Sequence, residues 1–143
     1  FPPIPKEMFE GAKGWAPNDH AAEHSRRSLY IFARRNLRFP FLEVFDAPDN
    51  NLSCPERGRS TTAPQSLTLL NATEVVTASE ALAKQLTRDA RTNEDRTTLA
   101  YRLVLGRKPT PREAELAREF LKTSPLSELC RALFNLNAFV YVD

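Results

Sequence analysis

The sequence predicts an all-α domain of about five or six helices, with a long ordered loop and an extended N-terminal arm. Three observations lead to this fold class. Beyond residue 63, apolar residues recur at helical spacing. Capping residues, prolines and a glycine separate these periodic segments. A chain of 143 residues with 41% apolar and 27% charged residues is typical of one soluble globular domain with its own core.

Residues 1–24 are rich in proline and show neither a helical nor a strand period. We therefore expect an extended arm or linker here, followed by a helical domain over residues 25–143. The large apolar residues of the arm, Trp15 above all, cannot be buried within the arm itself. The arm is thus expected to lie against another domain or chain.

The stretch "RRSLYIFARRN", residues 26–36, predicts a helix that begins after a Ser25 cap and buries Leu29, Phe32 and Ala33. Its Leu-Tyr-Ile-Phe core is also compatible with a strand, but the cap and the spacing of the charges favour the helix. Arginine suits fixed pairing with carboxylates, so the opposite face is a candidate interface. The residues of this arginine-rich face are Arg26, Arg27, Arg34 and Arg35.

Residues 37–63 contain prolines, a glycine and several Asp and Asn residues, which is turn chemistry throughout. A loop of this length inside a compact domain is uncommon and often functional. The alternative, of equal weight, is an ordered wrap pinned by apolar side chains. These are Phe39, Phe41, Phe45 and Leu52.

The same loop holds a candidate anion-binding or partner-binding site close to the helix start at Pro64. Its residues are Asp46, Cys54, Arg57, Arg59 and Gln65. The stronger alternative is that the two arginines pair with acids of the loop itself. Asp46 and Asp49 also resemble part of a calcium loop, but their spacing favours a role as turn formers.

Cys54 has three interpretations. A packed structural thiol ranks first, because Pro55 restricts the backbone of Cys54 to an extended form that fits a pinned loop. A disulfide with Cys130 ranks second. A nucleophile ranks last, because His20 and His24 offer no recognisable base motif. Cys130 itself is expected to be a buried thiol on the apolar face of the last helix.

Residues 63–90 predict two successive helices. Pro64 suits a first helical turn, and Leu67 and Leu70 follow on one face. Asn71 and Glu74 have the spacing of a capping box, so the second helix is expected to begin there. The inward stripe of that helix comprises Val75, Leu82, Ala83 and Leu86.

A stop and a start separate the next two helices. Gly106 is expected to end the first as its C-cap, while Thr110, Pro111 and Glu113 predict a capped start for the second. The inward residues expected in the first are Leu99, Ala100, Leu103 and Val104. Those in the second are Ala117, Phe120 and Leu121.

A final helix is expected to begin at a Ser124 cap, and the terminal "FVYVD" reads as an extended, β-prone tail. The apolar face of this helix gathers five residues at helical spacing. They are Leu126, Leu129, Cys130, Leu133 and Phe134.

Several classes of function are disfavoured by what the sequence lacks. It contains no CxxC or HExxH pair, no CxxCH for covalent haem, and no glycine-rich phosphate loop. The net charge of +2 is spread evenly, which opposes nucleic-acid binding. No run of 18 apolar residues is present, so a membrane span is not expected. The chain itself is thus expected to carry no metal and no cofactor.

Several separated motifs carry a resemblance that covers about residues 15–143. They are "RRSLYIFARRN", "FDAPD", "LSCPERGRSTTAPQSLTLLN", "GRKPT" and "NLNAFVYVD". In this order they resemble the C-terminal domain of unknown function of large planctomycete cytochrome-c-associated, PSD-type proteins. The sequence departs from that pattern at Ala138, where Glu is expected, and at Ser66, where Ala is commoner.

The resemblance implies that this piece ends a longer, exported protein, with a haem c domain upstream and partners in the same polypeptide or complex. It assigns no catalytic residue. We therefore expect a non-catalytic structural and docking domain of an extracytoplasmic, haem-linked assembly. The alternative is that loop 45–65 contributes to an active site shared with upstream domains, acting on anionic or polysaccharide substrates.

Overall fold

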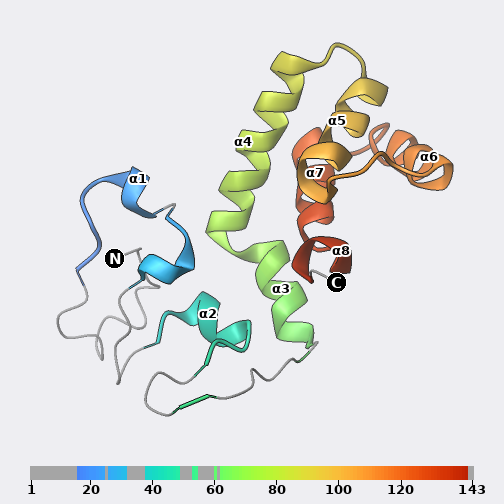
Figure 1. Ribbon diagram of the computed structural model, residues 1–143. Helices are drawn as coiled ribbons and strands as arrows, with labels where there is room; N and C mark the ends of the chain where they lie inside the picture. The colour runs from blue at the N-terminus through green and yellow to red at the C-terminus, as the bar shows by residue number, and fades with distance from the viewer. Residues whose placement is uncertain are drawn as a thin grey trace. The chain divides into compact units, whose positions relative to one another are not determined.

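The structure is a computed structural model that describes residues 16–24, 26–31, 38–48, 53–54, 60 and 62–141 (Figure 1). Over these residues all regular structure is helical, with eight α-helices and one 3-10 helix. Five of the α-helices have nine or more residues, so the all-α prediction and its helix count are confirmed. The chain divides into two compact units, an N-terminal unit of residues 1–62 and a helical unit of residues 63–143.

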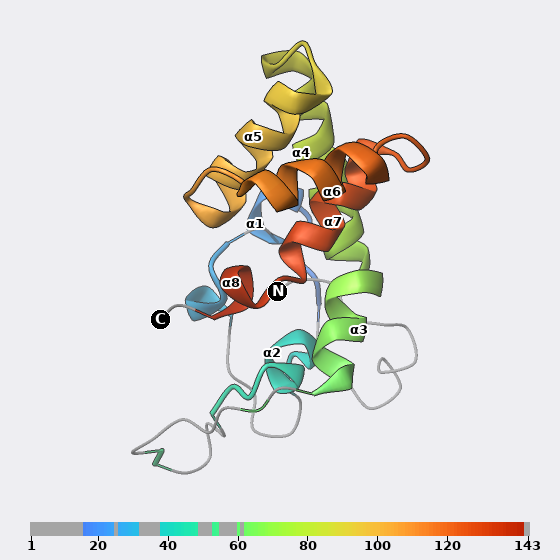
Figure 2. The same ribbon diagram turned by 90° about the vertical axis from the view of Figure 1, so that its right-hand side faces the viewer.

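The helical unit is built around its longest helix, α4, which packs mainly against α7 (Figures 1 and 2). Helix α5 packs on both, α6 packs mainly on α5, and α3 contacts α4 and α7. The short α8 lies against α5 and α7. The bounds are α3 Ala63–Asn71, α4 Thr73–Asp89, α5 Asn93–Leu105, α6 Pro111–Phe120, α7 Leu126–Phe134 and α8 Asn137–Val140.

The core lies where α4, α5 and α7 meet. Leu86 of α4 and Cys130 of α7 are fully buried, at 0% exposure. Ala100 and Tyr101 of α5 and Leu133 of α7 complete the cluster. Burying one leucine side chain stabilises a fold by about 1.5 to 3 kcal/mol, so Leu86 and Leu133 each contribute a free energy of this order.

The end of α5 and the start of α6 follow the predicted capping chemistry. Gly106 ends α5 with φ of 69°, the left-handed conformation that glycine adopts without strain. Thr110 and Glu113 form the predicted capping box at the start of α6, with Pro111 in the first turn. The start of α5, for which no cap was predicted, is capped by Thr92, whose hydroxyl accepts a hydrogen bond from the Asp95 N–H at 3.1 Å.

Two predicted caps are wrong. Helix α4 begins after Ala72 and α7 after Pro125, both without a side-chain cap. Asn71 remains in α3, where its Nδ2 donates to the Leu67 carbonyl at 2.9 Å. The Ser124 N–H donates to the Phe120 carbonyl at 3.0 Å, so Ser124 completes the turn that follows α6. In both cases a bond to the preceding helix takes the place of the expected cap.

The inward stripes are confirmed except at their edges. Leu82, Ala83, Leu99, Val104 and Leu126 pack against the core cluster as predicted. Three residues expected to point inward are instead largely exposed: Leu67, Leu103 and Phe120, at 58%, 51% and 38%. In α3 the buried leucine is Leu69. The apolar face of each of these helices is therefore wider than the area that its neighbouring helices bury.

The C-terminal tail differs from the prediction. Residues Asn137–Val140 form the short helix α8, and the backbone becomes extended only at Tyr141. The rings of Phe134 and Phe139 lie with their centroids 5.2 Å apart, which holds α8 against the end of α7. Residues 142–143 lie outside the described residues.

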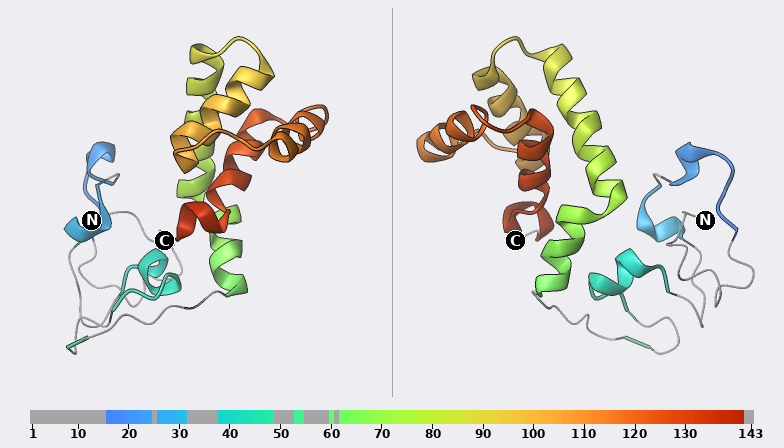
Figure 3. Two further views of the ribbon diagram at one scale, coloured as in Figure 1. Left: turned by 45° about the vertical axis from the view of Figure 1, so that its right-hand side comes forward. Right: turned by 180° about the vertical axis from the view of Figure 1, so that it is seen from behind.

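The described part of the N-terminal unit contains only single helical turns (Figure 3). These are α1 Ala21–His24, the 3-10 helix η2 Ser28–Tyr30 and α2 Pro40–Val44. The helix predicted to begin at Arg26 does not form over residues 26–31. Arg27 and Ile31 flank η2 with ψ of 141° and 126°, both extended values that stop a helix. Leu29, expected to be buried, is 85% exposed.

The predicted loop over residues 37–63 contains the helical turn α2, which starts with Pro40 in its first turn. The rings of Phe41 and Phe45 contact each other, with centroids 5.1 Å apart, as an ordered wrap requires. Four more of the predicted residues, Leu52, Phe32, Ala33 and the Ser25 cap, lie outside the described residues.

Candidate functional site

The candidate loop is closed by one acidic residue. Oδ2 of Asp46 accepts hydrogen bonds from the Ser60 N–H at 2.8 Å and from the Ser60 hydroxyl at 2.7 Å. Asp46 itself has φ of 55°, a left-handed conformation that Asp tolerates better than most residues. Asp46 therefore acts as a turn former that joins two points of the loop.

The other predicted residues of this loop have separate roles. Gln65 is buried in the first turn of α3, where its Oε1 accepts a hydrogen bond from the Tyr141 hydroxyl at 3.4 Å. That bond joins the beginning of the helical unit to its end. Cys54 is exposed, so its predicted place in an apolar slot is wrong. Both cysteines are thiols, and Cys130 is buried as expected. Arg57 and Arg59 lie outside the described residues.

The arginine-rich interface is described only at its beginning. Arg26 is exposed and its Nη2 pairs with Oε1 of Glu23 at 2.6 Å. Arg27 is exposed and stands just before η2. Arg34 and Arg35 lie outside the described residues, so the predicted interface stays a prediction.

A second polar cluster joins the end of α5 to the start of α6. The Arg107 guanidinium donates to both carboxylate oxygens of Glu113, at 2.8 and 2.7 Å. The Thr110 N–H donates to the same carboxylate at 2.7 Å. The guanidinium carbon of Arg107 also lies 5.7 Å from the ring centroid of Tyr101, within range of a cation–π contact. We call these four residues the α5–α6 clasp.

The clasp strongly favours the ionised form of its carboxylate. Hydrogen bonding from Arg107 lowers the pKa of Glu113 to about 2, and the bonds from Thr110 act in the same direction. Burial raises the pKa of the Tyr101 hydroxyl, and the negative charge of Glu113 adds to that effect. Burial likewise raises the pKa of the Cys130 thiol to about 11. None of these groups changes its charge near neutral pH.

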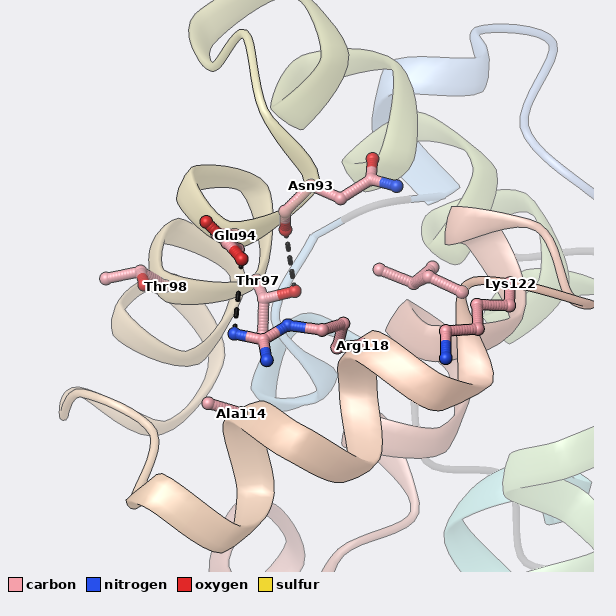
Figure 4. Close-up of a pocket in the computed structure, with 8 residues that line it drawn as sticks. Asn93, Glu94, Thr97, Thr98, Ala114, Arg118 and Lys122 are labelled. Atoms are coloured by element: carbon pink, nitrogen blue, oxygen red, sulfur yellow. Dashed lines mark hydrogen bonds and ion pairs between the residues drawn. The ribbon is translucent and has the colours of Figure 1, made fainter.

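A cleft of about 340 Å³ opens between α5 and α6 (Figure 4). Arg118 reaches across it from α6, and its Nη2 lies 3.1 Å from Oε1 of Glu94 on α5. Thr97 lies beside this pair on α5, its hydroxyl donating to the Asn93 carbonyl at 2.8 Å. The lining residues are Asn93, Glu94, Thr97, Thr98, Ala114, Arg118, Leu121 and Lys122. We call this space the α5–α6 cleft.

The α5–α6 cleft has a charged rim and a less polar floor. Arg118 and Lys122 are exposed at the rim, while Ala114 and Leu121 are half-buried and Thr97 is buried. Such a surface suits a polar ligand with an apolar body. None of the residues predicted from the sequence as a site lines the cleft. Its polar residues come from two helices about twenty positions apart, and no local motif unites them.

Other kinds of site are not found among the described residues. No group of three His, Cys, Asp or Glu side chains is placed to hold a metal ion there. Every buried side-chain nitrogen or oxygen in that part of the chain has a hydrogen-bond partner. No helix in it combines the length and the apolar character needed to cross a membrane.

Comparison with known proteins identifies a family without an assigned activity. The family model described as PSD1, protein of unknown function (DUF1553), matches residues 2–121. No curated protein and no solved structure matches the chain. The matched range spans the loop closed by Asp46, the α5–α6 clasp and most of the α5–α6 cleft. The chain belongs to the PSD1 family of proteins of unknown function (DUF1553).

Proposed function

We propose that this chain is a non-catalytic structural and docking domain of a larger protein assembly. One observation carries the proposal: the described polar residues of the predicted site make internal bonds, and none of them lines the open cleft. Asp46 bonds Ser60, and Gln65 is buried against Tyr141. An enzyme site requires such groups to converge on a space that substrate can enter.

The ionisable groups of the helical unit support the same function. A general acid or base works best with a pKa near the operating pH. Glu113 and Cys130 have pKa values of about 2 and about 11, displaced away from neutrality in opposite directions. Both shifts follow from interactions that stabilise the fold.

Large apolar side chains on the surface of the helical unit are available to contact a partner protein. Leu116 and Phe120 stand one helical turn apart on α6 and are 60% and 38% exposed. Leu103 of α5 is 51% exposed. Exposed apolar side chains that gather on one element are typical of surfaces that contact another protein.

The resemblance of the sequence motifs supplies the setting that we propose. The assembly is extracytoplasmic and planctomycete-type, and a haem c domain lies upstream in the full-length protein. This chain has no CxxCH motif that could hold a covalent haem, so the haem belongs to a neighbouring domain. The partners are therefore other domains or chains of the same protein, and nucleic acid is not among them.

A second function is favoured by the exposure of Cys54. In that alternative, loop 45–65 contributes Asp46, Cys54 and Arg59 to an active site shared with upstream domains. An exposed thiol is accessible to a substrate in a way that a packed one is not. Against it stands the engagement of the Asp46 carboxylate by both donors of Ser60.

Cross-linking of the full-length protein tests the docking function. Lys108 and Lys122 are exposed on the helical unit and react with a short amine-directed cross-linker. We expect mass spectrometry to find links from these lysines to residues outside this chain, and to lose those links when the protein is unfolded first. Links confined to residues 1–143 would overturn the proposal.

The alkylation rate of Cys54 separates the two functions. A docking domain predicts that the thiol of Cys54 reacts at the rate of a short unstructured peptide with the same flanking residues. An activated thiolate reacts at least about tenfold faster at neutral pH. Such a rate in the full-length protein would move the enzyme function to first place.

A further inference from the structure

We propose that the α5–α6 cleft binds the side-chain carboxylate of an acidic segment on a partner domain. This inference rests on the proposed docking function and names the chemistry of its partner. It is carried by the shape of the α5–α6 pair, by the exposure of the ion pairs at the cleft, and by the combination of charges on its rim.

The α5–α6 pair is tied at one end and open at the other. The clasp joins the last turn of α5 to the first turn of α6 through Arg107 and Glu113. Most of the cleft lining lies toward the opposite end, on the first turns of α5 and at the end of α6, and Ala114 extends it toward the clasp. Since α6 packs mainly on α5, this end is spanned by the Arg118–Glu94 pair rather than by a third helix. A ligand can therefore enter without disturbing the core.

The two cations at the cleft form exposed ion pairs with carboxylates of the same chain, and another carboxylate can replace these partners. Arg118 and Glu94 are 61% and 72% exposed, and the Lys122–Glu119 pair, 2.7 Å apart, is 61% and 65% exposed. Ion pairs at such exposure contribute little to stability, because water and salt screen them. An incoming carboxylate can replace Glu94 on the guanidinium of Arg118 at small cost, and two parallel hydrogen bonds then hold it.

The rim selects a single carboxylate over a polyanion. Glu94 lies against Arg118 and Glu119 lies against Lys122, so a phosphate or nucleic-acid strand would meet repulsion as well as attraction. The lining itself carries two cations, Arg118 and Lys122, and one carboxylate, Glu94, so a single incoming carboxylate balances its charge. The half-buried Ala114 and Leu121 offer contact to the apolar part of a glutamate side chain.

Titration of the chain with matched peptides tests the inference. The probe is a short acetylated and amidated peptide with one central glutamate, and its twin carries glutamine instead. We expect the glutamate peptide to shift the amide NMR signals of Thr97, Thr98 and Leu121 saturably, and the glutamine peptide to bind about tenfold more weakly. Equal binding of the two peptides would overturn the inference.

Variants of the cleft locate the binding. We expect Arg118→Gln to weaken the glutamate peptide about tenfold, and Arg102→Gln, an exposed arginine on α5 outside the cleft, to leave it unchanged. Glu94→Gln removes the internal competitor, so it should strengthen binding by up to about fivefold. Equal losses in the two arginine variants, or weaker binding by Glu94→Gln, would contradict a carboxylate site here.

Two further outcomes separate this inference from the docking function. Binding of free glutarate as tightly as the peptide would show a site for a small dicarboxylate and would overturn the partner segment. Cross-links from Lys122 to an upstream domain, together with no peptide binding, would retain the docking function and refute the carboxylate site. Peptide binding without any such cross-link would refute the docking function alone.

Discussion

The two units of the chain use similar residues with different results. In the helical unit, leucines at helical spacing reach a shared core, and Leu86 is fully buried. In the N-terminal unit, residues 22–24, 26–31 and 38–48 include no buried residue, and Leu29 is 85% exposed. The helical unit has helices of up to 17 residues, whereas the described helices of the N-terminal unit have three to five.

The difference shows that helix length decides whether an apolar pattern can be buried. A turn of three to five residues presents only one or two side chains to a neighbour, so it buries little apolar surface unless longer helices pack against it, as they do against α8. The described N-terminal unit is held instead by individual contacts, such as those of Asp46 with Ser60 and of Phe41 with Phe45. We expect substitutions to act cooperatively in the helical unit and locally in the N-terminal one.

The largest expected effect comes from a paired leucine substitution. Leu86→Ala removes a fully buried side chain and should lower the free energy of unfolding by about 3 kcal/mol, through lost burial and the cavity left behind. Leu29→Ala is the matched control and should change it by less than about 0.5 kcal/mol. Urea unfolding followed by far-UV circular dichroism measures both. Equal effects would erase the contrast between the units.

Substitution of the two cysteines, one in each unit, should change the free energy of unfolding by less than the leucine substitution does. Cys130→Ser places a hydroxyl in the core and should cost about 2 kcal/mol, while Cys54→Ser should cost less than about 0.5 kcal/mol. Because burial raises the pKa of Cys130 to about 11, its thiol stays protonated at about pH 8. A thiol reagent should therefore label Cys54 in the native protein and Cys130 only in urea. Rapid native labelling of Cys130 would show that the core is open.

The smallest expected effect is at the α5–α6 clasp and depends on pH. The folded pKa of Glu113 is about 2, below its ordinary value of 4.5. A lowered pKa in the folded state means that the carboxylate stabilises the protein above pH 4.5 and loses this contribution as the pH falls toward 2. Glu113→Gln should cost about 1 kcal/mol at neutral pH, because the clasp is partly exposed.

Unfolding midpoints measured across the acid range test this prediction. Glu113→Gln should flatten the fall in stability between pH 4.5 and about pH 2. Glu115→Gln, an exposed acid on the same helix, should leave the fall as it is. An unchanged acid profile in Glu113→Gln would show that the clasp contributes nothing to folding, in spite of its two short bonds to Arg107.

Short-range features were predictable because their causes are short-range. The capping box of Thr110 and Glu113 spans three residues, and the left-handed Gly106 depends on its own missing side chain. The inward positions of Leu86, Cys130 and Leu133 follow from helical spacing alone. Motifs such as CxxC and CxxCH also span only a few residues, so the sequence alone shows that they are missing.

The failures lie where a neighbour's position decides the outcome. Asn71 has the spacing of a cap, yet bonding to Leu67 keeps it in the preceding helix. Leu103 has the right period, but no described helix covers that side of α5. Cys54 has a sequence context that fits packing, yet its side chain is exposed.

The all-α class, the end of α5, the start of α6 and the apolar face of each long helix could be predicted from the order of residues, because backbone hydrogen bonds and side-chain period act within a few residues. The bond between Gln65 and Tyr141 and the pairing of Glu94 with Arg118 could not. These pairs join segments far apart in the chain. Their geometry depends on how helices pack against one another, which no local pattern encodes.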